Sequence, residues 1–269
     1  MRRIPFVMGG ALAVCVFSAP CFAGDTYIDI NVTDKGNANY NTATITFQGD
    51  STANVITGQY LYKVNSVSGD LNGLFTHMVG ETIYTYCVDL FDNPNGTKTL
   101  DVYDLSDAPI PDEDDFSNMG SNASSLIGVL HKKYWDSYDL GKSSADAFYA
   151  AAFQLAIWEI AYESENIDWS ESSAGAAGYD VFDDTSGSGF KVDGSDLGWR
   201  GQAQDWIAAA YADWKNGVRW RPLYAAGSET VVYQDFILIP IPLPAPIALA
   251  GIGLIGVLAG RRRLARLVK

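Results

Sequence analysis

The chain contains very little cysteine and histidine. Only three cysteines and two histidines occur in 269 residues. Zinc sites are built mainly from these two side chains, so their scarcity argues against a zinc centre. It also excludes the disulfide framework that stabilises many small exported proteins. We therefore expect neither a metal nor a cofactor, and attention turns to the cysteines that are present.

Basic residues are also scarce. The sequence has 18 lysines and arginines against 32 aspartates and glutamates. All 32 acidic residues lie between residues 24 and 235, with only 11 of the basic ones, which gives 11 − 32 = −21 for that region. Such a charge excludes nucleic-acid binding, which needs basic surfaces. It suits an extracellular protein, or one that meets cationic groups or calcium.

The first 23 residues have the pattern of a secretory signal peptide. Arg2 and Arg3 precede an apolar run from residue 7 to 17, and small residues end at Ala23. Cleavage at this point would remove Cys15 and Cys21. Cys87 would then be the only cysteine of the exported protein, which excludes an intramolecular disulfide.

The other end is apolar and then basic. Residues 236–260 carry no charge, and they precede a basic tail that begins with Arg261, Arg262 and Arg263. Prolines interrupt the first part, so a transmembrane helix is expected only at 247–260, with the tail on the cytoplasmic side. The proline-rich segment includes Pro242, Leu243, Pro244, Ala245 and Pro246.

This arrangement resembles a PEP-CTERM sorting signal of the VPLPA type, spanning residues 240–269. The resemblance implies a Gram-negative bacterium in which an exosortase recognises and removes the tail. The protein would leave through the inner membrane, with its C-terminal helix holding it in the membrane until processing. It would then reach the cell surface, the outer membrane or the extracellular matrix. A plain membrane anchor is the alternative.

Residues 24–235 are expected to form an α+β domain. Alternation of apolar and polar residues predicts strands that make residues 24–100 β-rich. The predicted strands are 27–32, 42–47, 60–64, 82–90 and a final strand at 229–239. Within a helical segment at 120–217, the predicted helices are 121–135, 143–163 and 202–215. This order favours an antiparallel barrel or sandwich core with a helical insertion, and a long loop at 164–201.

The helix at 143–163, capped by Ser143 or Ser144, carries an unusual glutamine. Nearly every residue from 147 to 162 is apolar, which predicts a buried helix. Gln154 lies on one face with small alanines and with Trp158. A buried amide without a partner costs ~1–3 kcal/mol, so Gln154 must have one. The partner is either a backbone group or Cys87, which alternation places on one strand face with Ile83 and Thr85.

Two short segments resemble the motifs of bacterial thioester domains. Tyr86-Cys87-Val88 is similar to the aromatic-Cys-aliphatic motif, and Phe153-Gln154-Leu155-Ala156-Ile157-Trp158 to the Gln-x-x-aliphatic-Trp motif. The resemblance implies an adhesin-like surface protein in which Cys87 and Gln154 form an internal thioester. Such a bond attaches covalently to an amine or hydroxyl on a host, a neighbouring cell or the matrix. Tyr86, Phe153 and Trp158 would surround the bond.

Other functions remain open. A Cys/His hydrolase would use Cys87 with His77 or His131 as base, although no supporting signature exists and we expect no enzyme. The acidic clusters near 112–115, 183–184 and 193–196 are expected to be solvated loops rather than calcium sites. Four tryptophans could form a carbohydrate-stacking surface: Trp199, Trp206, Trp214 and Trp220. The main alternative is therefore a matrix structural or carbohydrate-binding protein in which the Cys/Gln pair is only structural.

Overall fold

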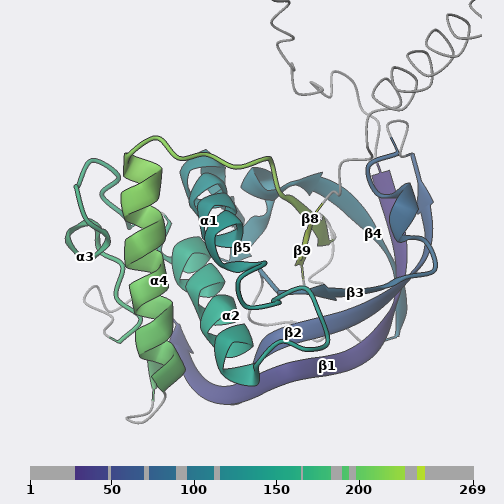
Figure 1. Cartoon of the computed structure of the whole chain (residues 1–269), viewed down its shortest axis with the longest axis horizontal. Helices are drawn as coiled ribbons and strands as arrows, with labels where there is room; N and C mark the ends of the chain where they lie inside the picture. The colour runs from purple at the N-terminus through teal and green to yellow at the C-terminus, as the bar shows by residue number, and fades with distance from the viewer. Residues whose placement is uncertain are drawn as a thin grey trace, which may run out of the picture.

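The structure is a computed structural model, and Figure 1 shows its whole chain. The residues that it describes are 28–47, 50–69, 73–88, 96–111, 116–164, 166–182, 190–193, 198–227 and 235–239. The predicted signal peptide, the sorting signal with its transmembrane helix, and most of the acidic clusters lie outside these residues. Within them, no helix has the length and apolar character needed to cross a membrane.

The described residues form a mixed α/β fold around one large antiparallel sheet, as the sequence predicts in outline. The sheet order is β3-β2-β1-β4-β8-β9, and β7 pairs with the far end of β1. The strands are β1 (Ile28–Phe47), β2 (Asp50–Ser68), β3 (Thr82–Thr85), β4 (Thr97–Asp104), β7 (Phe190–Asp193), β8 (Tyr224–Gly227) and β9 (Phe236–Leu238). A separate small hairpin joins β5 (Pro109–Pro111) to β6 (Phe116–Asn118).

The hairpin of β1 and β2 is long and strongly curved (Figure 1). Its register shifts at four places, and each shift is a bulge or irregularity that bends the ribbon. Gly58 lies at one of these irregular places, where an added Cβ would come within 2.6 Å of the Asn39 carbonyl oxygen. The two short strands predicted at 27–32 and 42–47 are therefore the two ends of one bent strand.

The sheet curls until its two edges meet. Beyond Thr85 the chain leaves β2, and Cys87 forms an antiparallel bridge with Phe236 of β9. The Val88 N–H donates to the Asp235 carbonyl over 2.8 Å, and the Ile237 N–H donates to the Tyr86 carbonyl over 3.0 Å. The sheet is therefore nearly closed and barrel-like, and Cys87 lies on the seam where the edges join.

Three long helices pack together on one side of the sheet (Figure 1). The helices are α1 (Gly120–Tyr134), α2 (Ala147–Tyr162), the short α3 (Ala174–Ala177) and α4 (Gly198–Lys215). Single 3-10 turns occur at Thr76–Met78 and Leu105–Asp107. The Asp146 carboxylate accepts a hydrogen bond from the Phe148 N–H, so Asp146 rather than Ser143 or Ser144 caps α2.

The segment between α2 and α4 differs from the prediction. Residues 164–201 were expected to form a long loop, but they contain α3 and β7. β7 adds to the main sheet by pairing with Thr44–Phe47 of β1. Its four residues are too few to show periodicity beside the surrounding polar residues. The helical segment is therefore not a separate insertion, because a strand of the central sheet lies within it.

Helix α2 is the centre of the molecule, as its apolar composition predicts. It contacts β1, β2, β7, α1 and α4, and all its residues from Ala150 to Tyr162 are buried. Glu159 is buried with them, and its Oε1 accepts a hydrogen bond of 2.7 Å from the Asp180 N–H. Its Oε2 has no hydrogen-bond partner among the described residues. Burial and the nearby Glu163 carboxylate raise the pKa of Glu159 well above 4.5.

Replacing Glu159 should therefore change how stability depends on pH. The folded state keeps a proton on Glu159 at pH values where the unfolded chain has lost it. This contribution is complete below about pH 4.5 and decreases as the pH rises toward the raised pKa. Urea unfolding across this range should show Glu159→Gln gaining stability over the wild type as the pH increases. A constant difference in stability between Glu159→Gln and the wild type across this range would contradict the assignment.

Candidate functional site

The site is built on the three residues that close the sheet. Tyr86, Cys87 and Val88 are all buried, so side chains on both faces of this segment lie inside the protein. Cys87 is therefore a cysteine sealed within the core.

Gln154 bonds directly to Cys87, through its backbone. The Cys87 N–H donates to Oε1 of Gln154 over 2.9 Å, and Nε2 of Gln154 donates to the Cys87 carbonyl over 2.7 Å. Both residues are fully buried. The structure thus brings together the two residues that the sequence singles out. The partner of Gln154 is therefore a backbone group, which is the first of the two alternatives, and this backbone group belongs to Cys87.

The geometry of the seam explains why the carboxamide fits there. Cys87 and Phe236 form a non-hydrogen-bonded pair, so the N–H and C=O of Cys87 point away from β9. On that side the pairing with β2 has already ended at Thr85. The primary amide of Gln154 has one donor and one acceptor in the arrangement of a peptide group. It therefore takes the place of the missing strand and satisfies the buried backbone of Cys87.

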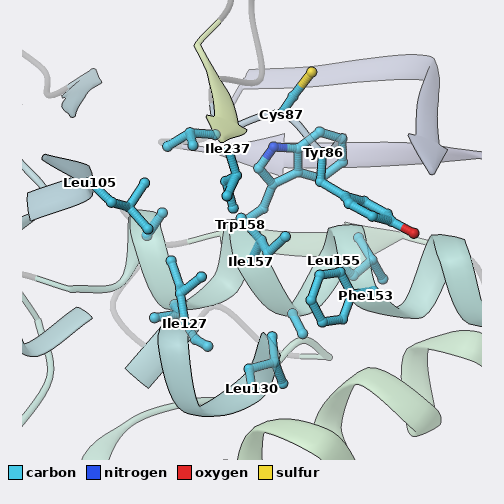
Figure 2. Close-up of a cluster of buried hydrophobic side chains, with 14 of the residues drawn as sticks. Tyr86, Cys87, Leu105, Ile127, Leu130, Phe153, Leu155, Ile157, Trp158 and Ile237 are labelled. Atoms are coloured by element: carbon cyan, nitrogen blue, oxygen red, sulfur yellow. The ribbon is translucent and has the colours of Figure 1, made fainter. Parts of the chain in front are cut away.

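Aromatic residues enclose this contact. Tyr86 packs edge-on against Phe153 with ring centroids 4.9 Å apart, and its hydroxyl donates to the Leu140 carbonyl. Figure 2 shows the indole of Trp158 beside Cys87. The Trp158 Nε1 is buried and has no hydrogen-bond partner among the described residues. All three predicted surrounding residues are thus buried around the pair, and they exclude water from it.

The contact has the polarity that acyl transfer at the carboxamide requires. Attack on the carboxamide carbon moves negative charge onto Oε1, which already accepts the Cys87 N–H. Sequence patterns could not reveal this donor, because a backbone N–H carries no signature of its own. In Figure 2 the Cys87 side chain points away from α2, and the sulfur is its most distant atom from that helix. Bond formation therefore needs a rotation about the Cα–Cβ bond that turns the sulfur toward the carboxamide.

The two histidines do not join this site. Both ring nitrogens of His77 and of His131 lack hydrogen-bond partners among the described residues, so neither histidine is bonded to Cys87. A cysteine hydrolase needs such a bond between nucleophile and base. The described residues also contain no cluster of three metal-binding side chains. The predicted sorting motif and basic tail lie outside the described residues.

No family model, curated protein or solved structure matches this chain. The geometry around Cys87 and Gln154 must therefore support any functional conclusion by itself.

A second glutamine provides a comparison for the structural role of Gln154. Gln204 on α4 accepts from the Val181 N–H and donates to the Tyr179 carbonyl, over 3.0 and 2.9 Å. It makes the same two kinds of bond as Gln154, but it is only half-buried and has no cysteine as its partner.

Gln154→Ala should destabilise the protein far more than Gln204→Ala. The first change leaves a fully buried N–H and C=O unpaired, at roughly 1–3 kcal/mol for each group. In the second change the lost side chain is itself half-buried, so water can enter the space that it leaves, and the cost should be about 1 kcal/mol. Urea unfolding of both variants measures the difference. Equal losses would show that the Gln154 carboxamide does not replace a strand at the seam.

Proposed function

We propose that this protein is an exported surface or matrix protein whose Cys87 and Gln154 form an internal thioester. The observation that carries the proposal is the double hydrogen bond between the Gln154 carboxamide and the Cys87 backbone. It holds the electrophilic carbon next to the residue that bears the nucleophile. Once the sulfur turns toward that carbon, the attack would be intramolecular and would proceed as if at very high local concentration.

Thioester formation is a balanced exchange. After rotation about its Cα–Cβ bond, the Cys87 sulfur attacks the carboxamide carbon and the C–N bond breaks. The thiol proton leaves with the amide nitrogen, so the products are a thioester and one ammonia. The Cys87 N–H stabilises the oxyanion on Oε1, and the Cys87 carbonyl holds Nε2 until it departs. Every group in this step belongs to Cys87 or Gln154.

The buried setting then preserves the bond. Tyr86, Phe153 and Trp158 exclude the water that would hydrolyse it. An amine or hydroxyl of a partner that reaches the carbonyl would form an amide or ester with Gln154 and release the Cys87 thiol. The protein would thus attach itself once to a host, a neighbouring cell or the matrix, without turning over as an enzyme.

The ends of the chain complete the proposal. The signal peptide would direct export through the inner membrane, and the resemblance to a PEP-CTERM signal would bring the protein to an exosortase. The C-terminal helix would hold it in the membrane until processing, and the surface or the matrix would be its destination. The acidic middle of the chain agrees with this location and with the absence of a nucleic-acid partner.

One observation favours the alternative in which the pair is only structural. Both polar atoms of the Gln154 carboxamide are already satisfied by the Cys87 backbone, so the pair stabilises the seam without any covalent bond. A thioester would also stabilise the fold, by about 4 kcal/mol if closure of the loop from Cys87 to Gln154 is treated like a disulfide. A chemical test is needed to distinguish a reactive thioester from a pair that is only structural.

The intact mass of the purified protein provides this test. We expect the wild type to weigh one ammonia less than the mass calculated for its termini. Cys87→Ser and Gln154→Glu should each have the full mass, because each lacks one reacting group. Gln204→Ala should keep the deficit, because it removes a comparable glutamine far from any cysteine. A wild type of full mass would refute the thioester.

Methylamine then separates a reactive bond from a structural one. A reactive thioester should add one methylamine at Gln154 and expose one thiol to a maleimide reagent. Trp158→Ala should react faster than the wild type, since it opens the wall beside Cys87. A thioester that is present but inert to methylamine, even in Trp158→Ala, would support the purely structural role.

A further inference from the structure

A cavity of about 420 Å³ opens beside the closing seam and takes no part in the proposed thioester chemistry. Its volume lies within the ~300–1,000 Å³ usual for small-molecule sites. Its wall is formed by β3, the last turn of α1, the segment before β8 and the end of β9. Thr85 and Ile237 are among the lining residues, and each is next in sequence to a residue of the seam.

Aromatic rings form one wall of the cavity. His131 stacks on Trp135 with ring centroids 4.4 Å apart, and Trp220 lies nearly parallel to His131 at 6.4 Å. Of the four tryptophans considered for a carbohydrate-stacking surface, Trp199, Trp206 and Trp214 are buried in the core. Trp220 is 40% exposed and lines this cavity. The stacking surface expected from four tryptophans is therefore reduced to one open ring beside a pocket.

Three residues of the cavity wall carry buried polar atoms that lack hydrogen-bond partners among the described residues. Both ring nitrogens of His131 and of His77, and Nε of Arg221, have no hydrogen-bond partner among the described residues. His131 is only 4% exposed. Buried polar atoms are normally satisfied, and unpaired ones in a pocket indicate a ligand that supplies the missing bonds.

The protonation state of His131 narrows the class of ligand that the cavity could bind. Burial, with a smaller contribution from the Arg221 charge, lowers the pKa of His131 to about 3. The ring is therefore neutral near pH 7 and presents one N–H donor and one nitrogen acceptor. A hydroxyl group can satisfy both, because it donates and accepts. A simple anion would leave the acceptor nitrogen unpaired.

The charges around the cavity also disfavour an ion. Glu81 and Asp136 line it together with Lys132 and Arg221, so neither sign dominates. The two cations lie over Trp220, with Lys132 Nζ 5.6 Å and Arg221 Cζ 5.4 Å from the ring centroid. A purely apolar ligand would leave every polar atom unsatisfied. A ring that carries hydroxyls on its edge and C–H groups on its face fits both the aromatic wall and the unpaired atoms.

We propose that this cavity binds a neutral sugar ring of an extracellular polysaccharide, with Trp220 under the ring and His131 and Arg221 bonding its hydroxyls. The site is independent of the thioester, because none of its binding atoms belongs to Cys87 or Gln154. A polysaccharide held here lies next to the seam that carries Cys87. Non-covalent recognition of the matrix would thus occur beside the proposed covalent site.

Titration calorimetry of the full chain with a panel of neutral sugars tests this proposal. The panel consists of glucose, galactose, mannose, N-acetylglucosamine and their disaccharides. We expect saturable binding of at least one member, with a change in tryptophan fluorescence. Trp220→Ala should weaken that binding at least about tenfold, since an open ring supplies much of the contact. His131→Phe, which keeps the stacked ring but removes both nitrogens, should weaken it as well.

Matched controls separate this site from the rest of the protein. Phe182→Ala removes another exposed aromatic ring outside the cavity and should leave sugar binding unchanged. Cys87→Ser should also bind as the wild type does, so failure of the thioester would not affect this result. Absence of binding across the panel, or equal binding by Trp220→Ala, would overturn the proposal. Salt-sensitive binding of glucuronate without binding of glucose would show an anion site and overturn it too.

Discussion

The described structure depends on the side-chain amide of Gln154, which makes the two hydrogen bonds that a neighbouring strand would otherwise make. At the seam the sheet passes from β2 to β9, and the backbone of Cys87 loses its β2 neighbour on one side. A buried N–H and C=O without partners would oppose closure of the sheet. The Gln154 carboxamide supplies both bonds, so it fixes α2 against the seam and sets the place of the helices that pack on α2.

The same bonds give the site its chemical interest. A donor to Oε1 and an acceptor for Nε2 are what a structural contact needs, and the donor to Oε1 is also the group that would stabilise an oxyanion there. In the proposed function, the step from this contact to a covalent bond would be the turning of the Cys87 sulfur toward the carboxamide carbon and the loss of ammonia. The closing seam places the Gln154 carboxamide against the Cys87 backbone, and the cavity lined by Thr85 and Ile237 lies on the same strands.

Much of the fold could be predicted, because periodicity reports burial on one face of an element. The helices α1, α2 and α4 follow their apolar patterns closely, whereas β2 extends far beyond the predicted 60–64 and β3 ends at Thr85, short of the predicted 82–90. β4 was not predicted, and neither were the short strands β5, β6, β7 and β8, whose three or four residues are too few for a pattern. The cap of α2 was assigned to the wrong residues because serine and aspartate compete as caps, and only the path of the chain selects Asp146. The burial of Cys87 on both sides reflects packing from segments distant in sequence.

By itself, the sequence determined the composition of the site: one cysteine between residues 24 and 235, one glutamine in an apolar helix, and aromatic residues beside each. These are local properties, because they can be read from the residue itself and from its neighbours in the sequence. Only the tertiary structure decided that Gln154 meets Cys87 through its backbone, that His77 and His131 face a cavity instead of the thiol, and that Trp220 alone of four tryptophans stays open there. Such facts depend on how the sheet curls and closes, which is a balance of contacts across the whole chain that no short segment encodes.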